Sequence, residues 1–285
     1  ERFPVRGAHA EAAYDALVAL YTVKPLSGEQ YGVQISVANG GFAWRFLVPG
    51  GGRRRVCAEA ACWRLPEDSL VWYGGRPSDR KPAGGAGGWA CAPLRDLHRV
   101  SPQGQPQAMP VVAELPAAAG GGFAAVTEAA LYRYGGLRVE ARDGGGLCGV
   151  LAEKDGFDVD GRFRTPWRVL LLAPSLDALV NSDLVAALNP PPDPALFEND
   201  GWAAGGRGVR SGWRGAPDFM GADGEKRVID CAARLKFEFT TLDGGWESWT
   251  NAWDALKDVC GYAATNGVRV FVWKHAKDLN APADN

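Results

Sequence analysis

The sequence predicts two domains, an antiparallel β-sandwich followed by a parallel α/β unit. Glycine supplies 38 of the 285 residues and proline 19, so turns are frequent and an all-helical bundle is disfavoured. Hydrophobic residues alternate with other residues up to about residue 173, whereas strand and helix patterns alternate after residue 208. A chain of this length has room for one large domain or two ordinary ones.

The predicted sandwich depends on period-two segments separated by turns. The clearest alternation of apolar and other residues falls at residues 33–37, 42–48 and 137–142. Such alternation is typical of antiparallel strands with one buried face. Glycine- and proline-rich turns or longer loops are predicted at residues 49–52, 74–88, 143–146 and 155–161. This spacing of strands and turns favours a β-sandwich.

A change of pattern marks the end of the sandwich. Residues 190–192 are three consecutive prolines, which end any helix and stiffen the chain. The sequence therefore predicts a sandwich of residues 1–205 and an α/β unit of residues 206–285. Within the second unit we expect strands at 209–213, 237–243 and 268–273, and helices at 223–235 and after a capping Asn251.

Repeated βα units imply parallel strands joined by right-handed crossovers, as in a (β/α)₈ barrel or an open doubly wound sheet. A complete eight-unit barrel takes about 250 residues. Residues 208–285 have room for only the first three βα units, so a barrel reading implies a chain truncated at its C-terminus. Phe237, Phe239 and Phe271 would then present apolar surface to strands that this chain does not contain.

Charge and cysteine content exclude several classes of function. Lys plus Arg number 31 and Asp plus Glu 33, so no basic surplus indicates a nucleic-acid partner. No run of about 18 apolar residues predicts a membrane-spanning helix. No basic and apolar leader follows Glu1, which leaves the compartment open. The six cysteines contain no C-x-x-C pair, and buried thiols are predicted in preference to disulfides.

The chemistry of the second unit is expected at the C-terminal ends of its strands, where the βα loops converge. Aromatic, carboxylate and cationic side chains follow the three predicted strands: Trp213, Asp243, Trp246, Lys274 and His275. This mixture suits a sugar, whose apolar face stacks on indole and whose hydroxyls need hydrogen-bond partners. The alternative, that Asp243 is a cap and Trp246 and Trp249 are core aromatics, stays open.

Several motifs resemble glycoside hydrolase family 97. Residues 165–169 read Thr-Pro-Trp-Arg-Val, and residues 188–191 read Leu-Asn-Pro-Pro, similar to the end of that family's N-terminal sandwich. Residues 40–46 resemble one of its strands. The resemblance runs from about Tyr31 to His275. It implies a β-super-sandwich followed by a (β/α)₈ barrel, action on terminal α-glucosides or α-galactosides, and a periplasmic or secreted enzyme.

The resemblance also implies a bound calcium ion that assists the acid carboxyl. One family ligand is a sandwich glutamate in a stretch like His-Glu-Ala-Ala-Leu, and residues 127–131 read Thr-Glu-Ala-Ala-Leu. Glu128 is therefore the metal candidate. Calcium takes several oxygen ligands, so Glu128 alone cannot hold it. Without the resemblance, Glu128 would be interpreted as a solvated carboxylate at a strand end.

The resemblance further implies that the catalytic carboxyl groups are missing from this chain. In the family, the acid and the other calcium glutamates come from later barrel strands, which would lie beyond Asn285. No catalytic residue is therefore assigned, and the chain by itself is expected to be inactive. Ala276 follows His275, where the family's inverting branch has a glutamate, so the chain resembles the retaining, α-galactosidase-type branch.

The sequence thus predicts an incomplete piece of an enzyme that hydrolyses terminal α-glycosidic bonds of an oligosaccharide or α-glycoside. One alternative is a non-catalytic carbohydrate-binding sandwich that uses exposed tryptophans such as Trp63, Trp72 or Trp89. Another assigns residues 208–285 to an open α/β domain of a different enzyme, with phosphate at a strand end.

Overall fold

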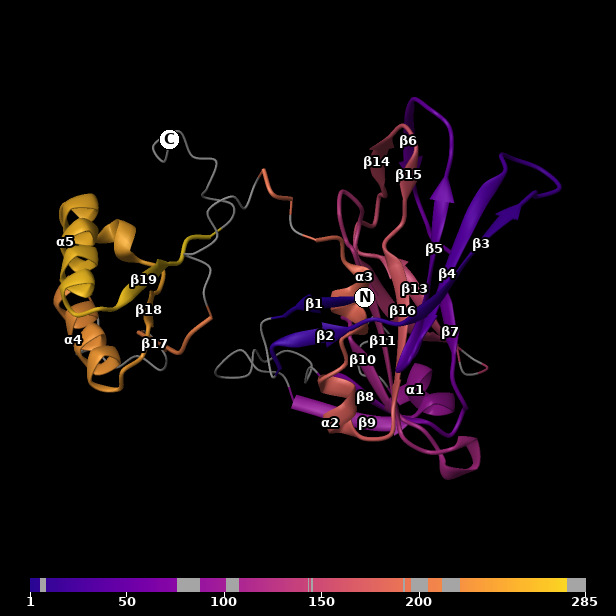
Figure 1. Ribbon diagram of the computed structural model, residues 1–285, viewed down its shortest axis with the longest axis horizontal. Helices are drawn as coiled ribbons and strands as arrows, with labels where there is room; N and C mark the ends of the chain where they lie inside the picture. The colour runs from indigo at the N-terminus through magenta and orange to yellow at the C-terminus, as the bar shows by residue number, and fades with distance from the viewer. Residues whose placement is uncertain are drawn as a thin grey trace. The chain divides into compact units, whose positions relative to one another are not determined.

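The structure is a computed structural model (Figure 1). It describes residues 1–5, 9–75, 88–100, 108–142, 144, 146–191, 193–195, 205–211 and 221–275. The chain forms two compact units, Glu1–Asp193 and Pro194–Asn285, hereafter unit 1 and unit 2. The division falls earlier than the boundary predicted after residue 205. Trp213 lies outside the described residues.

Unit 1 is built on a large antiparallel sheet, which we call the central sheet (Figure 1). Eight strands follow one another across it in the order β3 (Ala16–Val23), β4 (Tyr31–Ala38), β5 (Gly41–Val48), β16 (Trp167–Ala173), β11 (Phe123–Ala129), β10 (Val111–Glu114), β8 (Leu70–Gly75) and β9 (Gly88–Pro93). A further strand, β15 (Phe163–Arg164), pairs with β5. The antiparallel strands predicted at residues 33–37 and 42–48 are confirmed as β4 and β5.

A second, smaller sheet packs on one face of the central sheet and makes the sandwich. It contains β12 (Leu137–Arg142), β13 (Gly146–Leu151) and β7 (Cys62–Arg64), all antiparallel. Residues of both sheets share one hydrophobic core, which includes Val126 and Leu170 of the central sheet and Trp63, Val139 and Leu147 of the smaller one. The predicted antiparallel sandwich is therefore confirmed, including the strand expected at residues 137–142.

Short helices cover part of the opposite face of the central sheet. Helices α2 (Leu176–Val180) and α3 (Leu184–Leu188) bury Leu179 and Leu184 in a second core with Trp167. The remaining elements of unit 1 are helix α1 (Leu94–Val100), the 3₁₀ turn η1 (Ala117–Ala119), and two ribbons, β1 (Arg2–Pro4) with β2 (Glu11–Ala13) and β6 (Arg53–Val56) with β14 (Phe157–Asp160). Strand β14 occupies most of the segment predicted as a turn at residues 155–161.

Near its end, strand β4 departs from the burial that its alternation predicts. Val37 is exposed, whereas Ser36 is buried beside Ala43 of β5. The Ser36 hydroxyl lies 2.6 Å from the hydroxyl of Tyr14, so its burial leaves no unpaired polar group. Val33 and Ile35 are half-buried, so the departure from the alternation is confined to Ser36 and Val37.

The prediction of buried thiols is wrong. Cys62 and Cys148 form a disulfide, Cys57 and Cys91 are exposed, and Cys231 and Cys260 are half-buried. Cys62 and Cys148 lie directly opposite one another on β7 and β13. They are 86 residues apart in the sequence, so only the register of the two strands brings them together.

Unit 2 contains a three-stranded parallel sheet in the order β17 (Gly208–Arg210), β18 (Phe239–Leu242) and β19 (Arg269–Val272). Helices α4 (Gly221–Arg234) and α5 (Ala252–Thr265) and the 3₁₀ turn η4 (Trp246–Ser248) connect the strands. Apolar side chains of the sheet and helices form one core: Ile229, Ala232, Leu242, Trp246, Leu256, Val259, Ala263 and Val268. The predicted alternation of parallel strands and helices is confirmed.

Two details of unit 2 differ from the sequence predictions. Asn251 precedes α5 in a left-handed conformation, with φ 51°, and its side chain makes no capping hydrogen bond. Phe239 is buried, because Phe271 packs 4.8 Å from it between ring centroids and the Arg269 guanidinium lies 4.3 Å over its ring. Phe237 packs partly buried against the unit 2 core, and only Phe271 of the three phenylalanines is exposed as predicted.

No described helix is long and apolar enough to cross a membrane.

The disulfide predicts a measurable loss of stability on its removal. We expect Cys62→Ala to lower the free energy of unfolding of unit 1 by about 2–5 kcal/mol, because the cross-link closes a long loop in the unfolded chain. Urea unfolding followed by fluorescence measures the change. The matched variant Cys57→Ala, which removes an exposed free thiol, should unfold like the wild type. Equal stability of both variants would contradict the disulfide.

Candidate functional site

Among the described residues of unit 1, the guanidinium of Arg168 on β16 is the most buried charge, with its side chain 0% exposed. Its Nε and Nη2 donate to the two carboxylate oxygens of Glu59, each at 2.6 Å. Its Nη1 donates to Oε2 of Glu128 on the neighbouring strand β11, at 2.5 Å. The Tyr134 hydroxyl donates to Glu59 at 3.0 Å. We call these four residues the Arg168 network.

The sequence-predicted metal candidate Glu128 belongs to this network. Its Oε2 accepts hydrogen bonds from Arg168 and, at 3.4 Å, from the backbone N–H of Leu137. Burial raises the pKa of the Glu128 carboxyl, and the charge of Arg168 offsets part of that rise. Burial and the negative charge of Glu59 likewise raise the pKa of Tyr134, which keeps the phenol a hydrogen-bond donor.

The Arg168 network is suited to supply one ligand to a cation. Two carboxylates face one guanidinium, which leaves one formal negative charge in a largely buried place. Among the described residues, nothing bonds to Oε1 of Glu128, whereas both oxygens of Glu59 are engaged. A hard cation needs several oxygen ligands. The described part of the chain contains no group of three or more His, Cys, Asp or Glu side chains placed to hold a metal, so Glu128 would be one contributor among ligands from elsewhere.

In unit 2 the structure brings four predicted site residues to the C-terminal ends of β18 and β19. Asp243 follows β18 and binds Arg210, at the end of β17, through Oδ2 at 2.6 and 3.1 Å. Trp273, after β19, donates its backbone N–H to Leu242, and its carbonyl accepts from the indole Nε1 of Trp246 at 3.1 Å. Parallel strands thus place these loop residues on one edge, as the sequence predicted.

The four residues differ in how they could meet a ligand. Trp246 is buried and packs edge-on against Trp253, with ring centroids 5.1 Å apart, so its indole is a core side chain rather than a stacking surface. Lys274 lies with Nζ 6.0 Å from the Trp246 ring centroid. His275 is exposed, and its ring is 6.0 Å from that of Trp273. Asp243, Lys274 and His275 therefore present polar groups at this edge. Trp273, which is exposed beside them, is the aromatic side chain that a ligand could contact.

A second carboxyl group of unit 2 lies close to Asp243. Glu225, in the first turns of α4, is buried and accepts a 2.5 Å hydrogen bond from the hydroxyl of Ser211 through Oε1. Within the described residues, its Oε2 has no hydrogen-bond partner. Burial raises the pKa of the Glu225 carboxyl, the Ser211 hydrogen bond opposes that rise, and the charge of Asp243 adds to it. Glu225 is too buried to reach a ligand in this arrangement.

The fold and these sites correspond to a known family. A family model described as the N-terminal domain of glycosyl hydrolase 97 matches residues 2–191. The chain belongs to glycoside hydrolase family 97. The family 97 resemblance carried by residues 165–169 and 188–191 is thereby confirmed.

Three proteins similar to this family 97 chain illustrate its relatives. A protein of Streptomyces bingchenggensis (strain BCW-1), named a probable retaining alpha-galactosidase, is 25% identical over 275 residues, which covers 89% of this chain and 39% of that protein. A family 97 enzyme from Pseudoalteromonas sp. strain K8, solved in complex with acarbose, matches with TM-score 0.71 and 16% identity over 95% of this chain and 44% of its own.

A solved beta-arabinopyranosidase gives the same TM-score of 0.71, at 20% identity, over 96% of this chain and 45% of its own. At these identities the solved structures establish the fold alone. The chain spans less than half the length of each of these relatives.

The sequence reasoning missed Glu59, Tyr134 and Arg168 as site residues. A usable signal was present, because Arg168 interrupts the apolar run of residues 167–173. A charge in a strand buried on both faces must have a partner, so this arginine predicts a buried carboxylate. Glu59 itself stands in an irregular segment before β7, and nothing in its local sequence indicates the pairing.

The Arg168 network predicts a strongly destabilising substitution. We expect Arg168→Met to lower the free energy of unfolding by about 3–5 kcal/mol, because Glu59 and Glu128 are then left buried without a cation. Urea unfolding measures the change, and Arg138→Met, at an exposed site on β12, is the matched control. Adding Glu59→Gln to Arg168→Met should restore part of the loss. A loss no larger than that of the control would show that the network does not stabilise the sandwich.

Proposed function

We propose that this chain supplies the sandwich and the first three βα units of a family 97 enzyme that hydrolyses terminal α-galactosides or α-glucosides. The observation that carries the proposal is the 25% identity to a probable retaining alpha-galactosidase, which extends over both units of the chain. The parallel order of β17, β18 and β19 supports the barrel assignment. The residue Ala276 after His275 supports the retaining branch.

The residues of this chain would bind substrate rather than cleave it. Glycoside hydrolysis normally uses two carboxyl groups. At the described strand ends of unit 2, Asp243 is paired with Arg210 and Glu225 is buried against Ser211, so neither is free to act as an acid or a nucleophile. Asp243, Lys274 and His275 are the proposed substrate contacts. We expect the 285-residue chain alone not to hydrolyse aryl α-galactosides or α-glucosides.

The proposed role of Glu128 is to contribute one oxygen ligand to calcium. Arg168 and the backbone N–H of Leu137 hold Oε2, which leaves Oε1 as the oxygen available to a cation. The remaining negative charge of the Arg168 network favours a cation at that position. A bound calcium ion would assist the acid carboxyl of the complete enzyme.

The calcium role of Glu128 is testable in a protein of the relatives' full length. We expect Glu128→Gln to weaken calcium binding about tenfold or more, because a charged oxygen ligand becomes a neutral one. Isothermal titration calorimetry with calcium chloride measures the affinity. Glu114→Gln, on β10 and exposed, is the matched control. Wild-type affinity in the Glu128 variant would remove Glu128 from the site.

The Cys62–Cys148 disulfide supports a periplasmic or secreted location. Disulfides form and persist in oxidising compartments and are rare in the cytosol.

A second candidate function, carbohydrate binding by the sandwich itself, has one specific observation in its favour. Trp72 on β8 and Trp89 on β9 are exposed by 43% and 71%. Trp89 lies opposite Gly74, two residues after Trp72, so both indoles are on the same face of this strand pair. Trp63, in contrast, is buried in the sandwich core. Two exposed indoles on one face can stack on sugar rings.

The two candidate functions predict different results from the same protein. If Trp72 and Trp89 form a sugar-binding face, maltooligosaccharides or galactooligosaccharides should change the tryptophan fluorescence of the 285-residue chain, and Trp72→Ala with Trp89→Ala should abolish the change. Trp253→Ala, at an exposed tryptophan of unit 2, should retain it. If the double variant still shows the same fluorescence change as the wild type, the two tryptophans have no binding role.

A further inference from the structure

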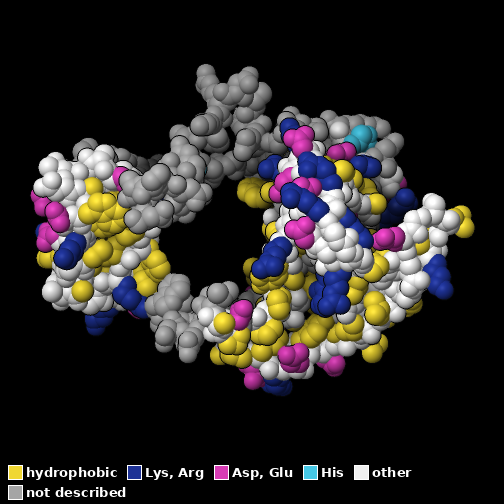
Figure 2. All heavy atoms as spheres, turned by 90° about the horizontal axis from the view of Figure 1, so that it is seen from above, with side chains coloured by type: hydrophobic (Ala, Val, Ile, Leu, Met, Phe, Trp, Pro, Cys, Tyr) yellow, Lys and Arg dark blue, Asp and Glu magenta, His cyan; other side chains and the backbone are white. Residues whose placement is uncertain are grey.

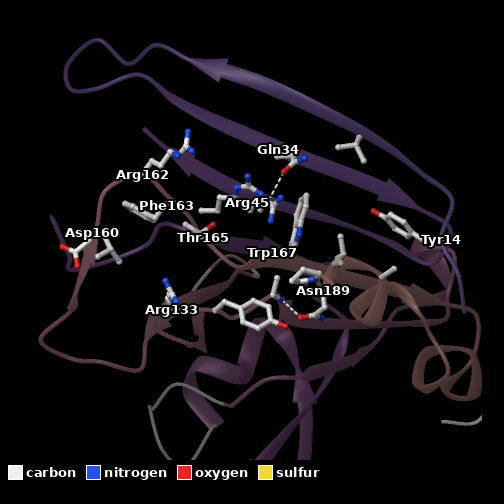
Figure 3. A pocket seen from close by; sticks show the side chains of 18 of the residues that line it. Tyr14, Gln34, Arg45, Arg133, Asp160, Arg162, Phe163, Thr165, Trp167 and Asn189 are labelled. Carbon is white, nitrogen blue, oxygen red and sulfur yellow. Dashed lines mark hydrogen bonds between the residues drawn. The ribbon is translucent and has the colours of Figure 1, made fainter. Parts of the chain in front are cut away.

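A groove of about 760 Å³ runs along one side of unit 1, with side chains of β5, β15 and β16 in its wall (Figure 3). Its volume is within the range of small-ligand sites. Four arginines line it: Arg45, Arg133, Arg162 and Arg164. In the described part of the chain, none of these four forms an ion pair with a carboxylate. We call it the arginine groove.

Arg45 is held in a fixed position in the wall of the arginine groove. Its Nε donates to Oε1 of Gln34 at 2.8 Å, and its guanidinium lies 4.2 Å over the ring of Trp167, as Figure 3 shows. Trp167 is itself buried in the core that α2 and α3 cover. A planar guanidinium stacked on a locked indole loses little conformational entropy when it binds a partner.

Arg164 brings a second positive charge to the same place. It lies on β15 opposite Leu47 of β5, two residues along the strand from Arg45. Burial lowers the pKa of Arg45, and the charge of Arg164 lowers it further. Arg45 is half-buried and Arg164 is exposed, and an anion between two guanidinium groups that repel one another stabilises both.

The two carboxylates of the arginine groove, Asp158 and Asp160, lie on β14, which pairs with β6. Asp158 binds Arg53 at 2.8 Å and Arg55 at 3.3 Å. Asp160 lies opposite Arg53 in the register of β14 and β6. Seen from above, the end of unit 1 that carries this ribbon shows basic and acidic side chains interspersed (Figure 2). Ion pairing therefore accounts for Asp158, whereas Asp160, Arg45 and Arg164 form no ion pair among the described residues.

Three neutral polar side chains of the arginine groove, those of Asn189, Thr165 and Tyr14, already form hydrogen bonds within the protein. Asn189 accepts from the backbone N–H of Ala130 and donates to the carbonyl of Val185. Thr165 accepts from the backbone of Phe46 and donates to the carbonyl of Pro166, and the Tyr14 hydroxyl bonds to Ser36. Tyr132 and the amide N–H groups of Gln34 remain as neutral donors, and the charged donors of the groove are its arginines, which favour an anion.

We propose that Arg45 and Arg164 form a binding site for an oxyanion, the carboxylate, sulfate or phosphate group of a ligand that occupies the arginine groove. A guanidinium offers paired N–H donors that match two oxygens of such a group. The groove has room for more than a bare ion, so the oxyanion is carried by a larger molecule such as an acidic saccharide.

Calorimetric titrations of the 285-residue chain test the proposal at constant low ionic strength. The probes are sodium D-glucuronate, sodium sulfate and D-glucose. We expect both anions to bind saturably, glucuronate more tightly than sulfate, and glucose not to bind at this site. Tighter binding of sulfate would support the oxyanion site but overturn the larger ligand. Absence of saturable anion binding, or equal binding of glucose and glucuronate, would overturn the proposal.

Substitutions locate the binding. Arg164→Gln should weaken glucuronate binding about tenfold, because one charge-assisted donor is lost, and Arg45→Gln by at least as much. Arg138→Gln, at an exposed arginine on β12 outside the groove, should bind like the wild type.

Arg164 is exposed, so its substitution should not disturb folding, and without anion Arg164→Gln should have a melting temperature equal to or above that of the wild type. Wild-type affinity in Arg164→Gln would exclude this pair of arginines as the site.

Discussion

The buried guanidinium of Arg168 is the constraint on which unit 1 depends. An arginine that is 0% exposed has lost its hydration completely, and only well-placed carboxylates compensate for that loss. Glu59 comes from the segment before β7, Glu128 from β11 and Tyr134 from the segment before β12. The requirement to pair one charge therefore ties the central sheet to the smaller sheet that covers it.

Strand β16 contributes side chains to both faces of the central sheet. Consecutive residues of a strand point to opposite faces, so Arg168 enters the ion network while Trp167 supports Arg45 in the arginine groove. The backbone after β11 links the same regions, because Asn189 at the end of α3 accepts from Ala130, two residues beyond Glu128. Strand β16 and the short segment after β11 thus position both the metal candidate Glu128 and the arginine groove.

Unit 2 follows a different physical rule, because its residues meet through parallel strand order. β17, β18 and β19 all run in the same direction, which places Arg210, Asp243 and Trp273 at neighbouring strand ends. Both units resemble family 97 enzymes in fold, and the relatives are more than twice as long as this chain. The strand-end groups described here are accordingly proposed as substrate contacts within a larger site.

The sequence by itself determined the local periodicities, and with them the order of antiparallel strands, parallel strands and helices. Its motifs at residues 165–169 and 188–191 also indicated the family. Tertiary structure alone decided which distant residues meet, as in the pairing of Arg168 with Glu59, the Cys62–Cys148 disulfide and the burial of Phe239 and Trp246. The reason is that periodicity reports which face of an element is apolar, whereas pairing depends on strand register and on charges contributed from far along the chain.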